Sequence, residues 1–257
     1  MKLCIYSNCQ GDGIAHFIRK VKPAWDIRVH HNWQLMMGEQ SPEALLADLK
    51  DCDVFVYQPT DGFVCKGGYV MPTTGDMVTS LPSHVARISF PYVFNTGFFP
   101  IVKSGKWWTG SALVQAAVKG ETNVVAGYDM NVWPFDCARR FAENLAEQSR
   151  REECCTLQFA PFILQNFQTK HMFLLHNHPA SALFVEMARA VLREIGPALD
   201  VEIPHDGPND ANLPGYHGVH PAVVRELGLR YEPDRTGEDM DYYRVLIQEM
   251  ASTKGVL

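Results

Sequence analysis

The amino-acid sequence predicts an α/β fold: a small doubly wound parallel sheet in the N-terminal half, merged with a mostly helical C-terminal half. Over the first ninety residues, short apolar runs alternate with segments of helical period, and short links join them. This alternation favours strand–helix–strand units with parallel strands. No linker separates the halves. We therefore expect one domain over 1–257, with an α/β subdomain at 1–100 and a mainly helical subdomain at 101–257 packed on it.

The first part supplies the strands of the predicted sheet. Apolar runs without helical period predict strands at 3–6, 27–31, 54–57 and 85–90. A helix is expected between Gly13 and Pro23, and a second one begins at Ser41, where a hydroxyl cap precedes a proline and an acid. Residues 59–80 are rich in Gly, Pro and Thr and are predicted to form a long loop.

After an aromatic stretch at 90–110, the chain follows helical patterns. We predict helices at 136–153, 158–168, 181–195, 221–227 and 239–250, and a strand at 172–175. The pattern from residue 181 stops at Gly196-Pro197, and the one from residue 221 stops at Gly228.

Composition excludes several classes of protein. Hydrophobic residues make up 46% and charged residues 20%, as in a globular chain with a full core. A formal charge of -6 argues against a nucleic-acid partner, because such binding needs a basic surface. No apolar run approaches the ~20 residues of a membrane span. The seven cysteines form no C-x-x-C pair, which favours a reduced, cytoplasmic protein over a disulfide framework or a cysteine-only zinc site.

The sharpest local feature is the turn Ser7-Asn8-Cys9-Gln10-Gly11, between the first strand and the first helix. Ligands of open α/β sheets gather at the carboxyl ends of strands, and free amides at a helix start favour an anion. The same field lowers a cysteine pKa. Cys9 is thus predicted to be a nucleophile or an oxyanion contact, or else a small residue that fills a tight turn. Cys4, within the strand, is expected in the core.

Two histidine groups could supply a base near neutral pH, at 176–179 and 217–221. Each lies before a predicted helix, so helix capping is the alternative role. A metal is not predicted, because no H-E-x-x-H is present. Neither a Walker A loop nor G-x-G-x-x-G occurs. Lys106 could meet a phosphate, with solvated surface charge as the alternative.

Several blocks together resemble the WcbI family, named for a capsular polysaccharide biosynthesis enzyme. They run in family order from residue 1 to about 230 and are Ser7-Asn8-Cys9-Gln10, Tyr57-Gln58-Pro59, the stretch from Phe90-Pro91 to Phe99-Pro100, Asn177-His178-Pro179 and His220-Pro221-Ala222-Val223. The resemblance implies an α/β part of Rossmann, flavodoxin or SGNH type merged with extra helices. It also implies a coenzyme A-binding protein that acts as an acetyltransferase on a sugar of a surface polysaccharide.

On this basis we expect acetyl-CoA as a substrate and a sugar or polysaccharide precursor as the acceptor. The predicted catalytic residues are Cys9, His178 and His220. The residues predicted to bind CoA are Ser7, Asn8, Gln10, Gly11, Gln58, Asn95, Lys106 and Asn177. Two alternatives stay open: an SGNH-like esterase or deacetylase with Cys9 as nucleophile, and a non-catalytic sugar- or nucleotide-binding protein. The block 217–221 is similar to the Asp-x-x-His-Pro ending of SGNH esterases, although His217 stands where that family has Asp.

Overall fold

The computed structural model describes residues 1–99, 101–104, 107–110, 136–211, 219–231, 245 and 249. The chain forms two compact units, each assembled from three stretches. The first unit comprises Met1–Tyr92, Gln148–Pro161 and Ser181–Leu213. The second comprises Val93–Glu147, Phe162–Ala180 and Pro214–Leu257.

The first unit is built on a four-stranded parallel sheet. Its strands are β1 (Lys2–Ser7), β2 (Asp26–His31), β3 (Val54–Tyr57) and β6 (Ala86–Ser89), in the order β2-β1-β3-β6. Strand β1 pairs with both β2 and β3; the chain runs from β1 to β2 and then crosses to β3 on the other side of β1. The predicted doubly wound sheet is confirmed, and so are its four strands.

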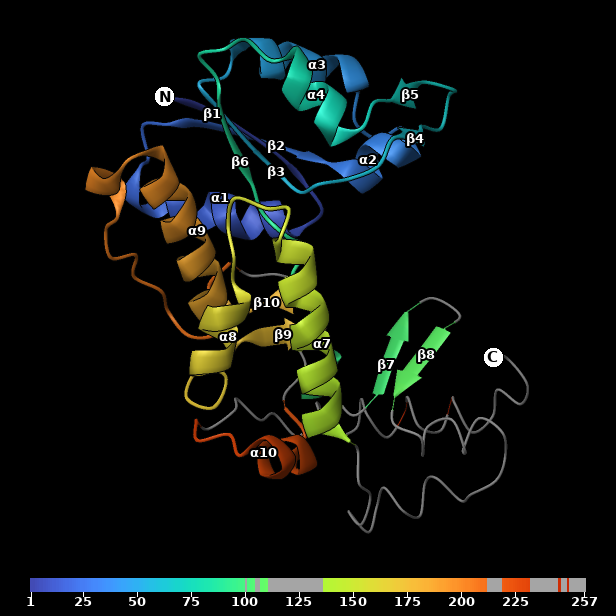
Figure 1. Cartoon of the computed structure of the whole chain (residues 1–257), viewed down its shortest axis with the longest axis vertical. Coiled ribbons are helices and arrows are strands. Elements are labelled where there is room, and N and C mark those ends of the chain that lie inside the picture. The colour runs from blue at the N-terminus through green and yellow to red at the C-terminus, as the bar shows by residue number, and fades with distance from the viewer. Residues whose placement is uncertain are drawn as a thin grey trace. The chain divides into compact units, whose positions relative to one another are not determined.

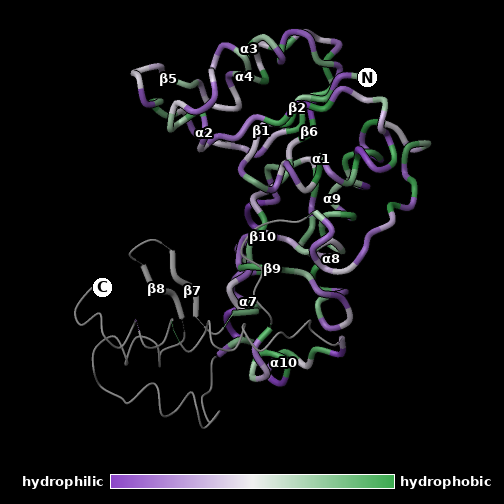
Figure 2. The backbone as a smooth tube through the Cα atoms, turned by 180° about the vertical axis from the view of Figure 1, so that it is seen from behind, coloured by the Kyte–Doolittle hydropathy of each residue, from purple (hydrophilic) through white to green (hydrophobic). Residues whose placement is uncertain are grey.

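Helices cover both faces of this sheet (Figure 1). Helices α1 (Gln10–Val21) and α9 (Ser181–Ile195) lie on one face, and α3 (Pro42–Asp51) and α4 (Thr74–Ser80) lie on the other. Because both faces are covered, the residues of β1 after Lys2 are buried, and Figure 2 shows green, hydrophobic stretches within the strands of this sheet. Helix α9 comes from the C-terminal half of the sequence, so the first unit draws on both halves of the chain.

Helix α1 approaches the sheet closely at its first turn. A side chain at Gly11 would collide with the Ser7 hydroxyl and lie 3.0 Å from Ile5 and 3.2 Å from Val29. At Gly13, a side chain would collide with the Phe184 ring of α9. Small residues at these two positions therefore let α1 fit between the sheet and α9.

The prediction of a long loop at 59–80 is wrong in part. The segment contains a hairpin of β4 (Phe63–Val64) and β5 (Val70–Met71), followed by α4. The hairpin turns at Gly67 and Gly68, both at positive φ. Helix α4 begins with a capping box in which Thr73 accepts from the Asp76 amide and Asp76 accepts from the Thr73 amide. A second short helix, α2 (Asn32–Met37), was also not predicted.

The second unit is mostly helical. It holds the 3-10 turn η1 (Thr96–Phe98), the hairpin of β7 (Ile101–Ser104) and β8 (Trp107–Gly110), the strand pair β9 (Phe173–Leu175) and β10 (His178–Pro179), and α10 (Pro221–Leu227). The units divide α7 (Cys137–Glu152) and α8 (Ala160–Asn166) between them. The Phe98 ring lies 5.5 Å from that of Phe141 and 5.4 Å from that of Phe173, which forms an aromatic core.

The helices predicted at 136–153, 158–168, 181–195 and 221–227 are all present, with bounds that differ by a few residues. The helix predicted at 239–250 falls almost entirely outside the described residues. None of the helices in the described part of the chain is long and apolar enough to cross a membrane. All seven cysteines of the sequence are described and are free thiols, as predicted.

Candidate active site

Cys9 lies at the carboxyl end of the central strand and caps the N-terminus of α1. Its thiol is half-buried, whereas Cys4, within β1, is 1% exposed. Strands β2 and β3 flank β1; the chain passes from β1 to β2 on one side of the sheet and from β3 to β6 on the other, so the strand order reverses between β1 and β3. Ligands of doubly wound sheets bind at such a switch point. The turn at Cys9 therefore occupies the position where the fold offers a binding site.

Hydrogen bonds within the protein fix this turn. Gln58, at the end of β3, accepts from the Asn8 amide at 3.0 Å and donates to the side chain of Gln10 at 3.0 Å. The Asn8 side chain accepts from the Gln10 amide at 2.9 Å, and the backbone carbonyl of Asn8 accepts from the Gly11 amide at 3.2 Å. Gln10 and Gln58 are both buried. The two glutamines thus brace the turn from within.

These bonds limit the prediction that free amides at the start of the first helix favour an anion. The amides of Asn8, Gln10 and Gly11 already have protein acceptors. Among the described contacts of the turn, the Cys9 amide has no acceptor on another residue. The Ser7 side chain is buried and donates to the Asn8 carbonyl at 2.7 Å. The Cys9 amide is therefore the candidate donor to a ligand.

The predicted lowering of the Cys9 pKa is wrong. Burial raises the pKa of the Cys9 thiol, and the negative charge of Asp12 raises it further, while the Cys9 amide works in the opposite direction. Desolvation disfavours a thiolate, and here it outweighs the hydrogen bond from the Cys9 amide. Cys9 is therefore a thiol at neutral pH.

An Asp–His pair beside this turn was missed in the sequence. His31, the last residue of β2, bonds through Nε2 to the Asp12 carboxylate at 2.8 Å and through Nδ1 to Gln34 at 2.7 Å. Asp12 lies in the first turn of α1. His31 is the register partner of Ser7, so both strand ends reach the same edge of the sheet. The parallel strands predicted from the sequence would have placed His31 there.

The predicted histidines belong to the second unit. His178 begins β10 and is half-buried, next to Asn177, which is also half-buried. The pKa of the neighbouring His176 is lowered, first by burial and then by the charge of His178. The structure thus brings His176 and His178 together within one strand pair.

His220 is 3% exposed and caps α10, and its Nδ1 accepts from the Ala222 amide at 3.0 Å. This bond fits the capping role that the sequence left open. Asn95 is also buried; its side chain accepts from the Gly97 amide at 2.8 Å and donates to the Phe141 carbonyl at 3.3 Å. Both residues therefore have structural bonds. Lys106 and His217 lie outside the described residues.

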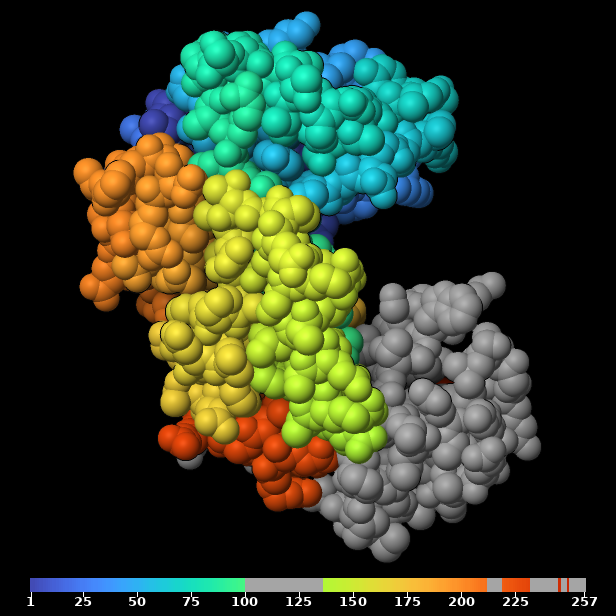
Figure 3. Space-filling view, viewed as in Figure 1, coloured from blue at the N-terminus to red at the C-terminus, as the bar shows by residue number. Residues whose placement is uncertain are grey.

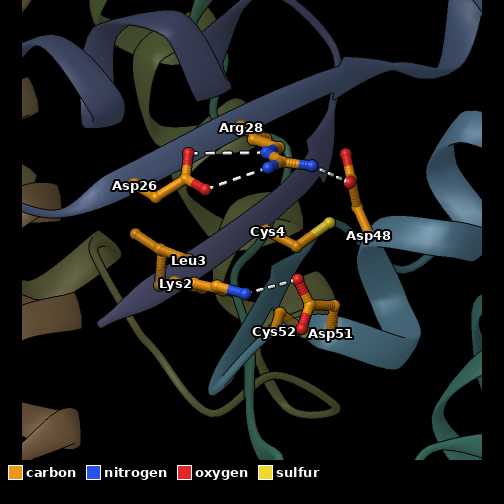
Figure 4. A pocket seen from close by; sticks show the side chains of 8 residues that line it. All are labelled: Lys2, Leu3, Cys4, Asp26, Arg28, Asp48, Asp51 and Cys52. Carbon is orange, nitrogen blue, oxygen red and sulfur yellow. Dashed lines mark hydrogen bonds and ion pairs between the residues drawn. The ribbon is translucent and has the colours of Figure 1, made fainter.

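The opposite edge of the sheet is lined by charges that pair with one another (Figure 4). Arg28 binds Asp26 at 3.0 Å and also binds Asp48, and Lys2 binds Asp51 at 2.5 Å. The hollow between them has a volume of about 10 Å³, room for about one water molecule. No group of three or more His, Cys, Asp or Glu side chains in the described residues is arranged to hold a metal ion.

Comparisons with known proteins identify the family. The protein-family model described as polysaccharide biosynthesis enzyme WcbI matches residues 2–200 of this chain. A solved structure of WcbI, described as a novel polysaccharide biosynthesis enzyme without a disulfide between CoA and one of its cysteines, is 16% identical with a TM-score of 0.72. The match covers 97% of this chain and 89% of that one, and it supports the likeness of fold. No curated protein matches the chain. Since the family model covers most of the sequence, the chain belongs to the WcbI family of polysaccharide biosynthesis enzymes.

Proposed function

We propose that this chain transfers an acyl group, with acetyl as the simplest case, from CoA to a hydroxyl of a saccharide precursor of a surface polysaccharide. The observation that carries the proposal is the Cys9 turn, with its half-buried thiol and open amide at the carboxyl end of β1. Family membership supports a role in polysaccharide synthesis. The description of the WcbI structure, which relates CoA to a cysteine, supports CoA as the ligand of this turn.

In the proposed reaction, the sugar oxygen attacks the thioester carbonyl. A C–O ester bond forms, the C–S bond breaks, and the hydroxyl proton passes through a base to the departing CoA thiolate. We assign the oxyanion contact to the Cys9 amide, since among the described contacts it has no acceptor on another residue. We assign the base to His178 over His220, because the Ala222 amide occupies Nδ1 of His220.

The raised pKa of Cys9 favours direct transfer over an acyl-enzyme. A thiolate is the nucleophilic form of cysteine, and burial together with Asp12 disfavours it here. The same argument weighs against an esterase with Cys9 as nucleophile. We therefore give Cys9 the role of lining the site of the acyl thioester. Asn8 and Asn177 are proposed to contact CoA. The residues proposed to affect CoA binding indirectly, by fixing the shape of the turn, are Ser7, Gln10, Gly11 and Gln58. Asn95 is proposed to do so by fixing η1.

A hollow at the same edge of the sheet is a candidate place for the sugar. It has a volume of about 420 Å³ and lies between the end of α2 and the β4–β5 hairpin. The hairpin lies at the surface of the first unit and is coloured cyan in Figure 3. Its lining mixes an aromatic ring with polar groups, among them Gln40, Ser41, Lys66 and Tyr69. Gln40 also accepts from the His31 amide at 3.0 Å. Such a mixture of ring, donors and acceptors suits a saccharide.

Titration calorimetry with CoA tests the proposal, followed by chromatography of CoA released from acetyl-CoA with and without a set of monosaccharides. We expect CoA binding, and release of CoA that depends on the saccharide. Cys154→Ser, at an exposed thiol, is the matched control for Cys9→Ser. Absence of CoA binding at millimolar ligand would count against the proposal. Acetate released from an acetylated sugar without CoA would instead indicate an esterase.

The binding-protein alternative has its own signature. It predicts that ligand binding survives in the double variant Cys9→Ala/His178→Ala, with no turnover in either form. The proposed transferase predicts turnover in the wild type and its loss in the double variant. His220→Ala, which removes a helix cap, serves as a control for loss of stability.

A further inference from the structure

His31, at the carboxyl end of β2, is fixed by hydrogen bonds from its ring and its backbone. Its Nε2 lies 2.8 Å from the Asp12 carboxylate, and its Nδ1 lies 2.7 Å from Oε1 of Gln34. Its backbone amide donates to Gln40 at 3.0 Å, and the Trp33 ring lies 5.9 Å from the imidazole. The His31 side chain is 12% exposed. The ring therefore has one fixed orientation, toward the first turn of α1.

This arrangement favours the protonated ring. Both nitrogens face oxygen acceptors, and an imidazole can donate from both only as the imidazolium. The pKa of His31 is accordingly raised, chiefly by the hydrogen bond to Asp12, although burial acts against it. A positive charge on His31 thus compensates the negative charge of Asp12.

Asp12 is the link from His31 to the reacting turn. Its amide donates to the Cys9 carbonyl at 3.2 Å, and its carboxylate is the charge that raises the pKa of the Cys9 thiol. Asp12 is also the charged group that acts on His31; the other neighbours described above, Gln34, Gln40 and Trp33, are uncharged. Whatever changes the net charge of the Asp12–His31 pair will act on Cys9.

We infer that His31 is a positioning residue for Cys9: its protonated ring fixes and neutralises the Asp12 carboxylate, and so it controls how easily a negative charge forms or binds at the Cys9 turn. In the proposed transferase, that negative charge would be the oxyanion or the departing CoA thiolate. The inference rests on the proposed function for this consequence alone. The control of Cys9 ionisation needs neither CoA nor a sugar to be tested.

The test is the pH profile of alkylation of Cys9 by iodoacetamide, read peptide by peptide with mass spectrometry. The exposed thiol of Cys154 serves as the internal reference in each sample. At pH 7, His31→Gln should lower the relative rate at Cys9 roughly threefold to tenfold, because the negative charge of Asp12 then stays uncompensated. Asp12→Asn should change the rate by less, because His31 loses its positive charge together with the carboxylate. His31→Arg, which keeps the charge, should return the rate toward that of the wild type.

The double variant Asp12→Asn/His31→Gln separates this role from a merely structural one. Without Asp12, His31 returns to an ordinary pKa near 6.5 and is mostly neutral at pH 7. The double variant should therefore match Asp12→Asn. His84→Gln, at an exposed histidine, should leave the profile unchanged.

Two results would overturn the inference: an unchanged Cys9 profile in folded His31→Gln, or an equal effect of His31→Gln with and without Asp12. If His31→Gln does not fold, NMR titration of His31 in the wild type and in Asp12→Asn decides the matter. The pKa of His31 should fall in Asp12→Asn, and an unchanged value would refute the pairing. Loss of CoA binding with these profiles intact would count against the proposed function alone.

Discussion

Gly11→Ala tests whether the close approach of α1 to the sheet holds the Cys9 turn in place. A side chain at position 11 would collide with the Ser7 hydroxyl and lie 3.0 Å from Ile5 and 3.2 Å from Val29. Gly75 provides a matched control, because it is also the second residue of a helix, α4. A side chain there would meet only the Thr73 hydroxyl, at an ordinary 3.5 Å.

The two substitutions differ mainly in packing. Alanine is favoured over glycine within a helix by about 1 kcal/mol, and this gain applies to both variants. Overpacking in a dense core costs about 1–3 kcal/mol, and this cost applies to Gly11→Ala alone. We therefore expect Gly11→Ala to be less stable than Gly75→Ala by about 1–3 kcal/mol. Ser7→Ala should recover part of the difference, because it removes the hydroxyl that collides.

Urea unfolding followed by circular dichroism gives the free energies of unfolding. Alkylation of Cys9 gives the local effect, and we expect it to be faster in Gly11→Ala than in Gly75→Ala because the shifted helix exposes the thiol. Equal stability of the two variants, with equal alkylation of Cys9, would refute the packing of α1 described above.

Three further predictions concern hydrogen bonds made by Asp210, Asn95 and His220. Burial raises the pKa of Asp210, but hydrogen bonds, chiefly the one from Lys20, lower it more, so that it falls to about 2. The stability lost in Asp210→Asn should thus be constant above about pH 5 and vanish as the pH falls through 4 to 2 in urea titrations. Asn95→Ala should cost about 1–3 kcal/mol by urea unfolding, because the buried Gly97 amide loses its acceptor. His220→Ala should lower the melting temperature of the protein, and His220→Asn should restore it by capping α10.

The sheet and most helices could be predicted because their signals are local. The strand at 54–57 is a run of apolar and aromatic residues, and the cap at Ser41 accepts from the Ala44 amide as its pattern predicts. The hairpin and the helix within 59–80 could not be predicted. The hairpin turns at glycines, which also occur in loops, and the helix follows a capping box but contains few apolar residues.

The place of the Cys9 turn in the fold was predicted, but its electrostatics were not. The turn at Cys9 follows from strand order, and the brace by Gln58 from its place at the end of β3. The raised pKa of Cys9 depends on burial and on the charge of Asp12, and neither can be read from the spacing of residues. The pair of Asp12 and His31 requires the register of β1 with β2, which arises only in the folded sheet.

The most direct test of the central claim, that CoA binds at the Cys9 turn, is protection of Cys9 from iodoacetamide by saturating CoA. Mass spectrometry of the peptides reports Cys4, Cys9 and Cys154 in one sample. Without CoA, we predict that Cys9 reacts ahead of the buried Cys4 and behind the exposed Cys154. With CoA, labelling of Cys9 should fall while that of Cys154 stays the same. Equal labelling of Cys9 with and without CoA would contradict the claim.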